Sequence, residues 1–144
     1  MSEDMYRILG IDFGSVRIGI ALSDPLRVIA KGLTTIPNDE NVYDAIHSII
    51  EEHNVQKIVV GYPLDLKGQT GAKTMEVDIF IQQLQRHFSL PVIRHDERFT
   101  SVIAEKAMLT MGTTKKQRRD KGRIDEIASA VMLQGFLDSV KKAL

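Results

Sequence analysis

The sequence of 144 residues contains no cysteine. Disulfide bonds, thiolate metal sites and cysteine nucleophiles are therefore excluded, and any metal ion must be held by oxygen or imidazole ligands. The absence of cysteine is typical of the reducing cytosol. No apolar run approaches the ~20 residues that span a bilayer, and Met1 to Asp4 lack the basic and then apolar order of a signal peptide. We therefore expect a cytoplasmic protein that does not contact a membrane.

The sequence also lacks net charge, because nineteen basic side chains balance nineteen acidic ones. Such a protein attracts a polyanion only through a local patch. One patch lies at Thr113–Ile124, TTKKQRRDKGRI, where like charges predict a mobile loop. This loop either is a solvated surface with no binding role or binds the phosphates of a nucleic acid. The candidate phosphate-binding residues are Lys115, Lys116, Arg118, Arg119, Lys121 and Arg123.

The pattern of apolar residues predicts a single α/β domain over residues 1–144. Alternating or short continuous apolar runs indicate strands at 6–13, 18–22, 27–36, 57–61 and 91–95. Apolar residues spaced three and four apart indicate helices at about 42–54, 72–88, 101–112 and 124–142. The first three strands form a meander, and each later strand follows a helix. We therefore expect a five-stranded mixed sheet flanked by helices.

An acidic residue, Asp12, lies inside the first hydrophobic strand, which is expected near the middle of the sheet. Burying an unpaired carboxylate costs several kcal/mol, so Asp12 must meet a solvated cleft, a cation or a set of donors. Gly10 and Gly14 flank it, which predicts clearance for a bulky ligand. The alternative is that Asp12 caps the turn of the first hairpin.

Two further acids are candidates for the same site: Glu97, at the end of the fifth strand, and Asp125, near the start of the last helix. Ligands gather at the carboxyl ends of strands in open α/β sheets. Clusters of carboxylates bind Mg²⁺ or Mn²⁺, and such ions support phosphodiester hydrolysis. The alternatives are that Asp125 complements the helix dipole and that Glu97 pairs with Arg98 at the surface.

Four stretches together resemble one known family. They read LGIDFGSVRIGIALSD, VVGYPLDLKGQTG, HDERFTS and KGRIDEIASAVMLQ, in this order from about Arg7 to Leu137. They closely resemble the YqgF (RuvX) family of bacterial proteins, which are described as Holliday junction resolvases and as pre-16S rRNA nucleases. The resemblance implies a ribonuclease H-like fold and a metal-dependent nuclease site. It also implies a role in maturing the 5′ end of small-subunit ribosomal RNA.

The acids implied by the resemblance fall on Asp12, Glu97 and Asp125, as catalytic residues and as ligands of Mg²⁺ or Mn²⁺. We expect Arg98 to contact the substrate phosphate and Tyr62 to stack on a base. His95, which lies beside Glu97 in the sequence, is expected to pack or form a hydrogen bond rather than bind metal.

The predicted function is phosphodiester hydrolysis in pre-16S rRNA, with RNA in preference to DNA, pre-ribosomal particles as partners, and a monomer or weak homodimer as the active form. Three alternatives are a Holliday junction resolvase, a non-catalytic RNA-binding ribosome-assembly factor, and an ATP-binding lobe of the actin and sugar-kinase type. A resolvase requires two symmetric active sites. The ATP-binding lobe requires a second lobe, for which a chain of this length has no room.

Overall fold

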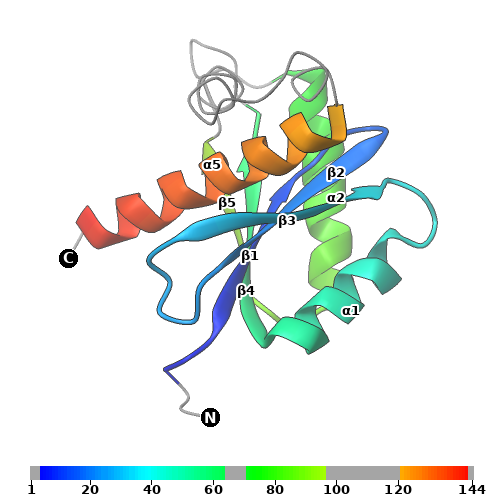
Figure 1. Ribbon diagram of the computed structural model, residues 1–144. Coiled ribbons are helices and arrows are strands. Elements are labelled where there is room, and N and C mark those ends of the chain that lie inside the picture. Colours follow the sequence, from blue (N-terminus) through cyan, green and yellow to red (C-terminus); the bar gives the residue numbers. More distant parts are fainter. Residues whose placement is uncertain (1–3, 64–70, 97–120, 143–144) are drawn as a thin grey trace.

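The computed structural model describes residues 4–63, 71–96 and 121–142. These residues form a five-stranded mixed sheet and three helices, as predicted (Figure 1). The predicted helix at 101–112 lies outside the described residues. The elements are β1 (Arg7–Asp12), β2 (Arg17–Ser23), β3 (Ala30–Pro37), α1 (Val42–His53), β4 (Val55–Tyr62), α2 (Ala72–His87), β5 (Val92–Asp96) and α5 (Lys121–Lys142).

The strand order is β3-β2-β1-β4-β5, so β1 occupies the middle of the sheet, as predicted. β1 runs antiparallel to β2, and β2 runs antiparallel to β3. β4 lies parallel to β1, and β5 lies parallel to β4. The carboxyl ends of β1, β4 and β5 therefore meet at one edge of the sheet, where the topology predicted a ligand site.

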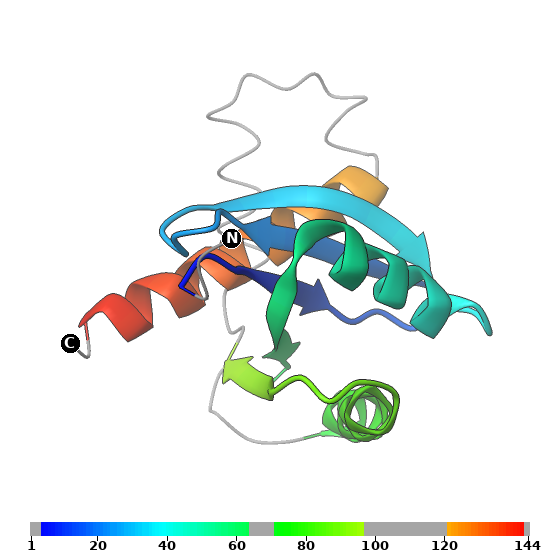
Figure 2. The same ribbon diagram turned by 90° about the horizontal axis from the view of Figure 1, so that it is seen from below.

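Helices cover both faces of the sheet, with α1 and α2 on one face and α5 on the other (Figures 1 and 2). Side chains alternate between these faces along β1. Leu9 and Ile11 belong to the core under α1 and α2. Ile8 belongs to the core under α5, with Met132 and Leu133 of that helix.

Glycine lets α5 approach the sheet closely. A Cβ at Gly10 would lie 2.9 Å from the Cβ of Leu133, and a Cβ at Gly32 would lie 2.6 Å from the Cγ of Glu126. The expectation that Gly10 and Gly14 clear space for a ligand is therefore wrong. The space at Gly10 is filled by α5, and a Cβ at Gly14 would meet the carbonyl group of Arg17 within the β1–β2 turn.

The third strand begins three residues later than predicted, because the carboxylate of Asp24 organises the preceding turn. It accepts hydrogen bonds from the amides of Leu26, Val28 and Ile29, at 3.1, 2.6 and 2.8 Å. Burial alone would raise the pKa of Asp24, but these amide donors outweigh it, and the pKa lies below its ordinary value. A side chain that binds its own backbone in this way competes with strand pairing.

The last helix begins at Lys121, so the final four residues of the stretch predicted to be a mobile loop are helical instead. Ala128 and Met132 of this helix are buried, and Ile127 and Val131 are half-buried. The first helix ends as predicted at Asn54, which adopts the left-handed conformation with φ 52° and ψ 52°. None of the described helices is both long and apolar enough to cross a membrane.

Candidate active site

Asp12 is the last residue of β1 and is half-buried. It faces α5, because side chains alternate along a strand and the position two residues earlier, Gly10, packs against Leu133 of α5. Its register partner on β2 is Gly19. Asp12 therefore lies at the carboxyl end of the central strand, on the α5 face, beside a strand position that has no side chain.

Asp125 of α5 packs directly on Gly19. A Cβ at Gly19 would lie 2.8 Å from the carbonyl carbon of Asp125 and 3.4 Å from its Cβ. Cross-strand partners lie about 5 Å apart, so Asp12 and Asp125 share Gly19 as a common neighbour. In Figure 1 the orange beginning of α5 lies against the blue β1–β2 hairpin. The structure thus brings two of the three predicted acids into one neighbourhood.

The helix-dipole interpretation of Asp125 does not fit the observed start of α5. The helix begins at Lys121, and its first turn contains no acidic residue. Because the dipole effect is confined to the first turn, Asp125 lies too far along the helix to benefit much from it. Its carboxylate instead accepts a hydrogen bond from Nε of Arg17 at 2.9 Å.

The sequence interpretation missed Arg17, although its position contained a usable signal. Arg17 lies two residues before Gly19 on β2, so alternation puts both on the face that α5 covers. Ala21, two residues further on, is fully buried on the same face. A charged residue on the same face of β2 as Gly19 and Ala21 indicates a partner on the helix that covers this face.

The third predicted acid, Glu97, and the predicted phosphate contact, Arg98, lie outside the described residues. Glu97 directly follows Asp96, which ends β5 beside Tyr62 of β4. The chain thus leaves β5 at the same edge of the sheet at which β1 ends with Asp12. Within residues 4–63, 71–96 and 121–142, no group of three or more histidine, aspartate or glutamate side chains could hold a metal ion.

The donors at this edge fit a hard divalent cation. Asp12 and Asp125 offer carboxylate oxygens, which Mg²⁺ and Mn²⁺ prefer. The carboxylate of Asp125 already has a cation beside it, the guanidinium group of Arg17. A divalent ion bound here would therefore share the Asp125 carboxylate with Arg17.

Tyr62 lies at the end of β4 with its hydroxyl group held in place. The hydroxyl donates to Oδ2 of Asp78 on α2 at 3.0 Å, and Arg94 of β5 donates to Oδ1 of the same carboxylate at 3.2 Å. The guanidinium carbon of Arg94 lies 5.6 Å from the centre of the Tyr62 ring. Burial, followed by the Asp78 carboxylate, raises the pKa of Tyr62. The ring is thus oriented and neutral, and its predicted stacking on a base stays a prediction.

His95 packs against α5, as predicted. Its ring meets Phe136 edge-on, with centroids 5.8 Å apart and an interplanar angle of 85°. A Cβ at Gly135 would lie 3.4 Å from its Nε2. Burial lowers the pKa of His95, although the nearby Asp96 opposes the shift. The imidazole is therefore a half-buried side chain whose neutral form is favoured by burial.

The described part of the basic stretch lies at the start of α5. The carbonyl of Gly122 accepts a hydrogen bond from the hydroxyl of Thr35 on β3 at 2.7 Å, which fixes the beginning of the helix on the sheet. Arg123 is half-buried there. Lys121 begins the helix. The other predicted phosphate-binding residues, Lys115, Lys116, Arg118 and Arg119, lie outside the described residues.

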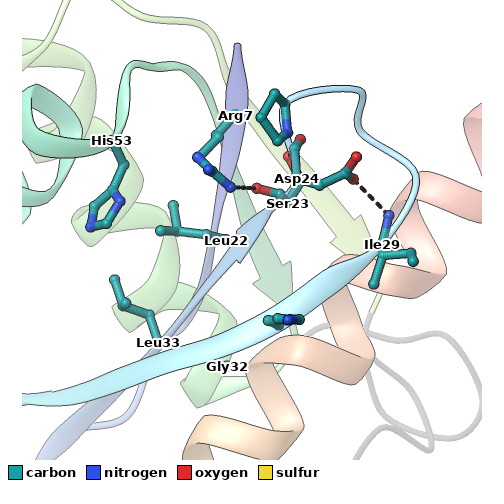
Figure 3. Close-up of a pocket in the computed structure, with 10 residues that line it drawn as sticks. Arg7, Leu22, Ser23, Asp24, Ile29, Gly32, Leu33 and His53 are labelled. Carbon is teal, nitrogen blue, oxygen red and sulfur yellow. Dashed lines mark hydrogen bonds between the residues drawn. The ribbon is translucent and has the colours of Figure 1, made fainter. Parts of the chain in front are cut away.

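A pocket of about 550 Å³ lies at the opposite end of β1 (Figure 3). Arg7, Leu22 and His53 are among its lining residues. Ser23, at the edge of the pocket, is buried, and its hydroxyl accepts a hydrogen bond from the amide of Ile8 at 2.8 Å. The pocket therefore belongs to the amino end of the central strand, and Asp12 to the carboxyl end.

The fold belongs to the ribonuclease H-like class. Two solved structures that share it are T. thermophilus RuvC in complex with a Holliday junction substrate and the fowlpox virus resolvase in complex with Holliday junction DNA. The first has a TM-score of 0.56 and 13% identity, covering 94% of this chain and 96% of RuvC. The second has a TM-score of 0.57 and 14% identity, covering 93% of this chain and 98% of the viral chain. At these identities the likeness concerns the fold alone.

The family follows from the sequence comparison. Residues 6–139 match the family described as "RuvX: Holliday junction resolvase". A protein of Phocaeicola vulgatus named "Putative pre-16S rRNA nuclease" is 41% identical over 138 residues, covering 95% of this chain and 99% of its own length. A protein of Sulfurihydrogenibium sp. with the same name is 43% identical over 136 residues, covering 93% of this chain and 91% of its own length. The chain belongs to the RuvX family.

Proposed function

We propose that this protein is a divalent-metal-dependent nuclease that hydrolyses phosphodiester bonds in RNA, in the maturation of the 5′ end of pre-16S rRNA. The observation that carries the proposal is the shared contact of Asp12 and Asp125 with Gly19, at the carboxyl end of the central strand. Membership of the RuvX family and the names of the relatives support the reaction and the substrate. This function implies a single cytoplasmic domain that meets pre-ribosomal particles.

In this proposal Asp12, Asp125 and Glu97 would hold Mg²⁺ or Mn²⁺. When bound, such an ion supplies an activated water and stabilises negative charge on the phosphate. Asp12 and Asp125 contribute carboxylates from two rigid elements, a central strand and a helix packed on it, which fixes their relative position. Arg17 holds the Asp125 carboxylate toward the sheet through its Nε hydrogen bond.

Contacts with the rest of the substrate are assigned to side chains around this edge. We assign Arg98 to the phosphate, and the basic side chains from Lys115 to Arg123 to the backbone of the strand, where each neutralised phosphate adds salt-sensitive affinity. Tyr62 is assigned to base stacking, since Asp78 fixes its hydroxyl and leaves the orientation of the ring set before substrate arrives.

A second candidate function is Holliday junction resolution. The family description and the junction-bound structural neighbours favour it. A junction must be cut at two symmetric points, so this function requires two copies of the site in one assembly. RNA processing does not impose this requirement.

Cleavage under single-turnover conditions tests the proposal and separates the two candidates. The substrates are RNA carrying the 5′ leader of pre-16S rRNA and a four-way DNA junction, each with Mn²⁺, with Mg²⁺ or with chelator. The proteins are the wild type, Asp12→Asn, and Asp44→Asn as a matched control, because Asp44 is an exposed carboxylate on α1.

We expect metal-dependent cutting of the RNA by the wild type and Asp44→Asn, and none by Asp12→Asn. Preferential cutting of the junction would favour the resolvase. RNA binding with no cutting by any of the three proteins would contradict the nuclease proposal and favour a non-catalytic assembly factor.

A further inference from the structure

Arg17 makes a direct contact with Asp125, one of the proposed metal-binding carboxylates. Its Nε lies 2.9 Å from Oδ2 of Asp125, and the two side chains are 37% and 30% exposed. Both groups reach this position from rigid elements. Arg17 begins β2, and Asp125 lies on the part of α5 that packs on Gly19. The contact is therefore a built feature of the sheet–helix interface rather than a chance meeting of surface side chains.

The charge of Arg17 opposes a specific cost of the proposed site. Carboxylates gathered to hold a divalent ion repel one another when no ion is bound. Asp12 and Asp125 share Gly19 as a neighbour, so their repulsion acts across the contact that holds α5 on the sheet. A guanidinium group that pairs with one of the two carboxylates, as Arg17 pairs with Asp125, reduces this repulsion. The interface can then form before any ion binds.

The same charge disfavours the ion. A divalent cation and a guanidinium group on one carboxylate repel each other, and they use the same limited set of oxygen lone pairs. Because both side chains are about one third exposed, solvent screens the effect to the range of partly exposed pairs, at most about 1 kcal/mol, which corresponds to about fivefold in affinity.

We propose that Arg17 is the built-in counter-ion of Asp125 in the metal-free protein, and that it competes with the divalent ion for this carboxylate. The proposal rests on the proposed function, since it requires Asp125 to be a metal ligand. Arg17 is thus a positioning residue whose removal has two opposite effects. The metal-free protein loses stability, and the affinity for the ion rises. A residue with a merely structural role would weaken both together.

Calorimetric titration with Mn²⁺, together with urea unfolding in chelator, separates these cases. The test variant is Arg17→Met, which keeps the aliphatic stem and removes the charge. Arg17→Gln is a second neutral variant in case the first folds poorly, and Arg17→Lys keeps the charge. The matched control is Arg7→Met, since Arg7 begins β1 and donates to the carbonyl of Ser23, at the end of the strand away from Asp12.

We expect Arg17→Met and Arg17→Gln to bind Mn²⁺ about fivefold more tightly than the wild type, and to unfold at lower urea in chelator. Arg17→Lys and Arg7→Met should keep the wild-type affinity. If the wild type binds Mn²⁺ and both neutral variants bind it with equal or lower affinity, the proposed role of Arg17 is overturned. The nuclease proposal would still stand in that case. No Mn²⁺ binding by any of these proteins, including the wild type, would overturn the metal site and this proposal with it.

Discussion

Replacing Gly19 with alanine tests how the structure brings Asp12 and Asp125 together. The added Cβ would lie 2.8 Å from the carbonyl carbon of Asp125, closer than the 3.0 Å that real Cβ atoms respect. The neighbouring atoms belong to the backbone of α5, so no side-chain rotation can relieve the clash. The first turns of the helix must move away from the sheet by up to about 1 Å to reach ordinary van der Waals contact.

The expected cost follows from this displacement. Overpacking of a tight interface destabilises a protein by about 1–3 kcal/mol. The movement also separates Asp125 from Asp12, and a misplacement of about 1 Å in a catalytic site can reduce the rate about 100-fold. We therefore expect Gly19→Ala to lose stability by about 1–3 kcal/mol and to lose most of its cleavage activity while remaining folded.

Urea unfolding and single-turnover cleavage measure the two effects. The matched control is Gly71→Ala, because a Cβ at Gly71 has no described atom within 4 Å. The backbone at Gly71 is extended, with φ −151°, a conformation that any residue can adopt. Because Gly71 is the N-cap of α2 and alanine caps a helix less well than glycine, the control should lose at most about 1 kcal/mol of stability and keep wild-type cleavage. Wild-type stability and activity in Gly19→Ala would refute the conclusion that the absence of a side chain at this position sets the distance between the two acids.

Two further predictions concern Ser23, which is buried, and His95, which is half-buried near the end of β5. Ser23→Ala removes the acceptor of the buried Ile8 amide, so the free energy of unfolding in urea should fall by about 1–3 kcal/mol; an unchanged value would show that another acceptor replaces the hydroxyl. Burial lowers the pKa of His95 below 6.5, so the unfolded chain binds the proton first and stability should fall as the pH drops from about 7 to about 5. In His95→Gln this part of the pH dependence should be absent, and an identical pH profile would contradict the assignment.

Local patterns in the sequence were enough to predict the sheet and the position of its central strand. The run around Leu9 and Ile11 alternates between two faces, and each later strand follows a helix, which allows few topologies. The closing of α1 at Asn54 was also predictable, since asparagine tolerates the left-handed conformation.

The errors arose where side chains act over longer distances. The turn before β3 depends on three amides gathered by Asp24, and strand propensity does not report such bonds. The role of Gly10 depends on Leu133, more than a hundred residues away. The partner of Arg17 is equally remote, although its alternation with Gly19 was visible in the sequence. The grouping of Asp12 with Asp125 was predictable as a hypothesis, but not the close packing through Gly19 that holds them together.

Thermal unfolding during Mn²⁺ titration tests the central claim, that Asp12 is one of the carboxylates that hold a divalent ion. We predict that Mn²⁺ raises the melting temperature of the wild type, by the equivalent of about 2.7 kcal/mol when the free ion reaches 100 times its dissociation constant. Asp44→Asn, the surface control, should show the same rise, and Asp12→Asn none. A full wild-type rise in Asp12→Asn would contradict the account.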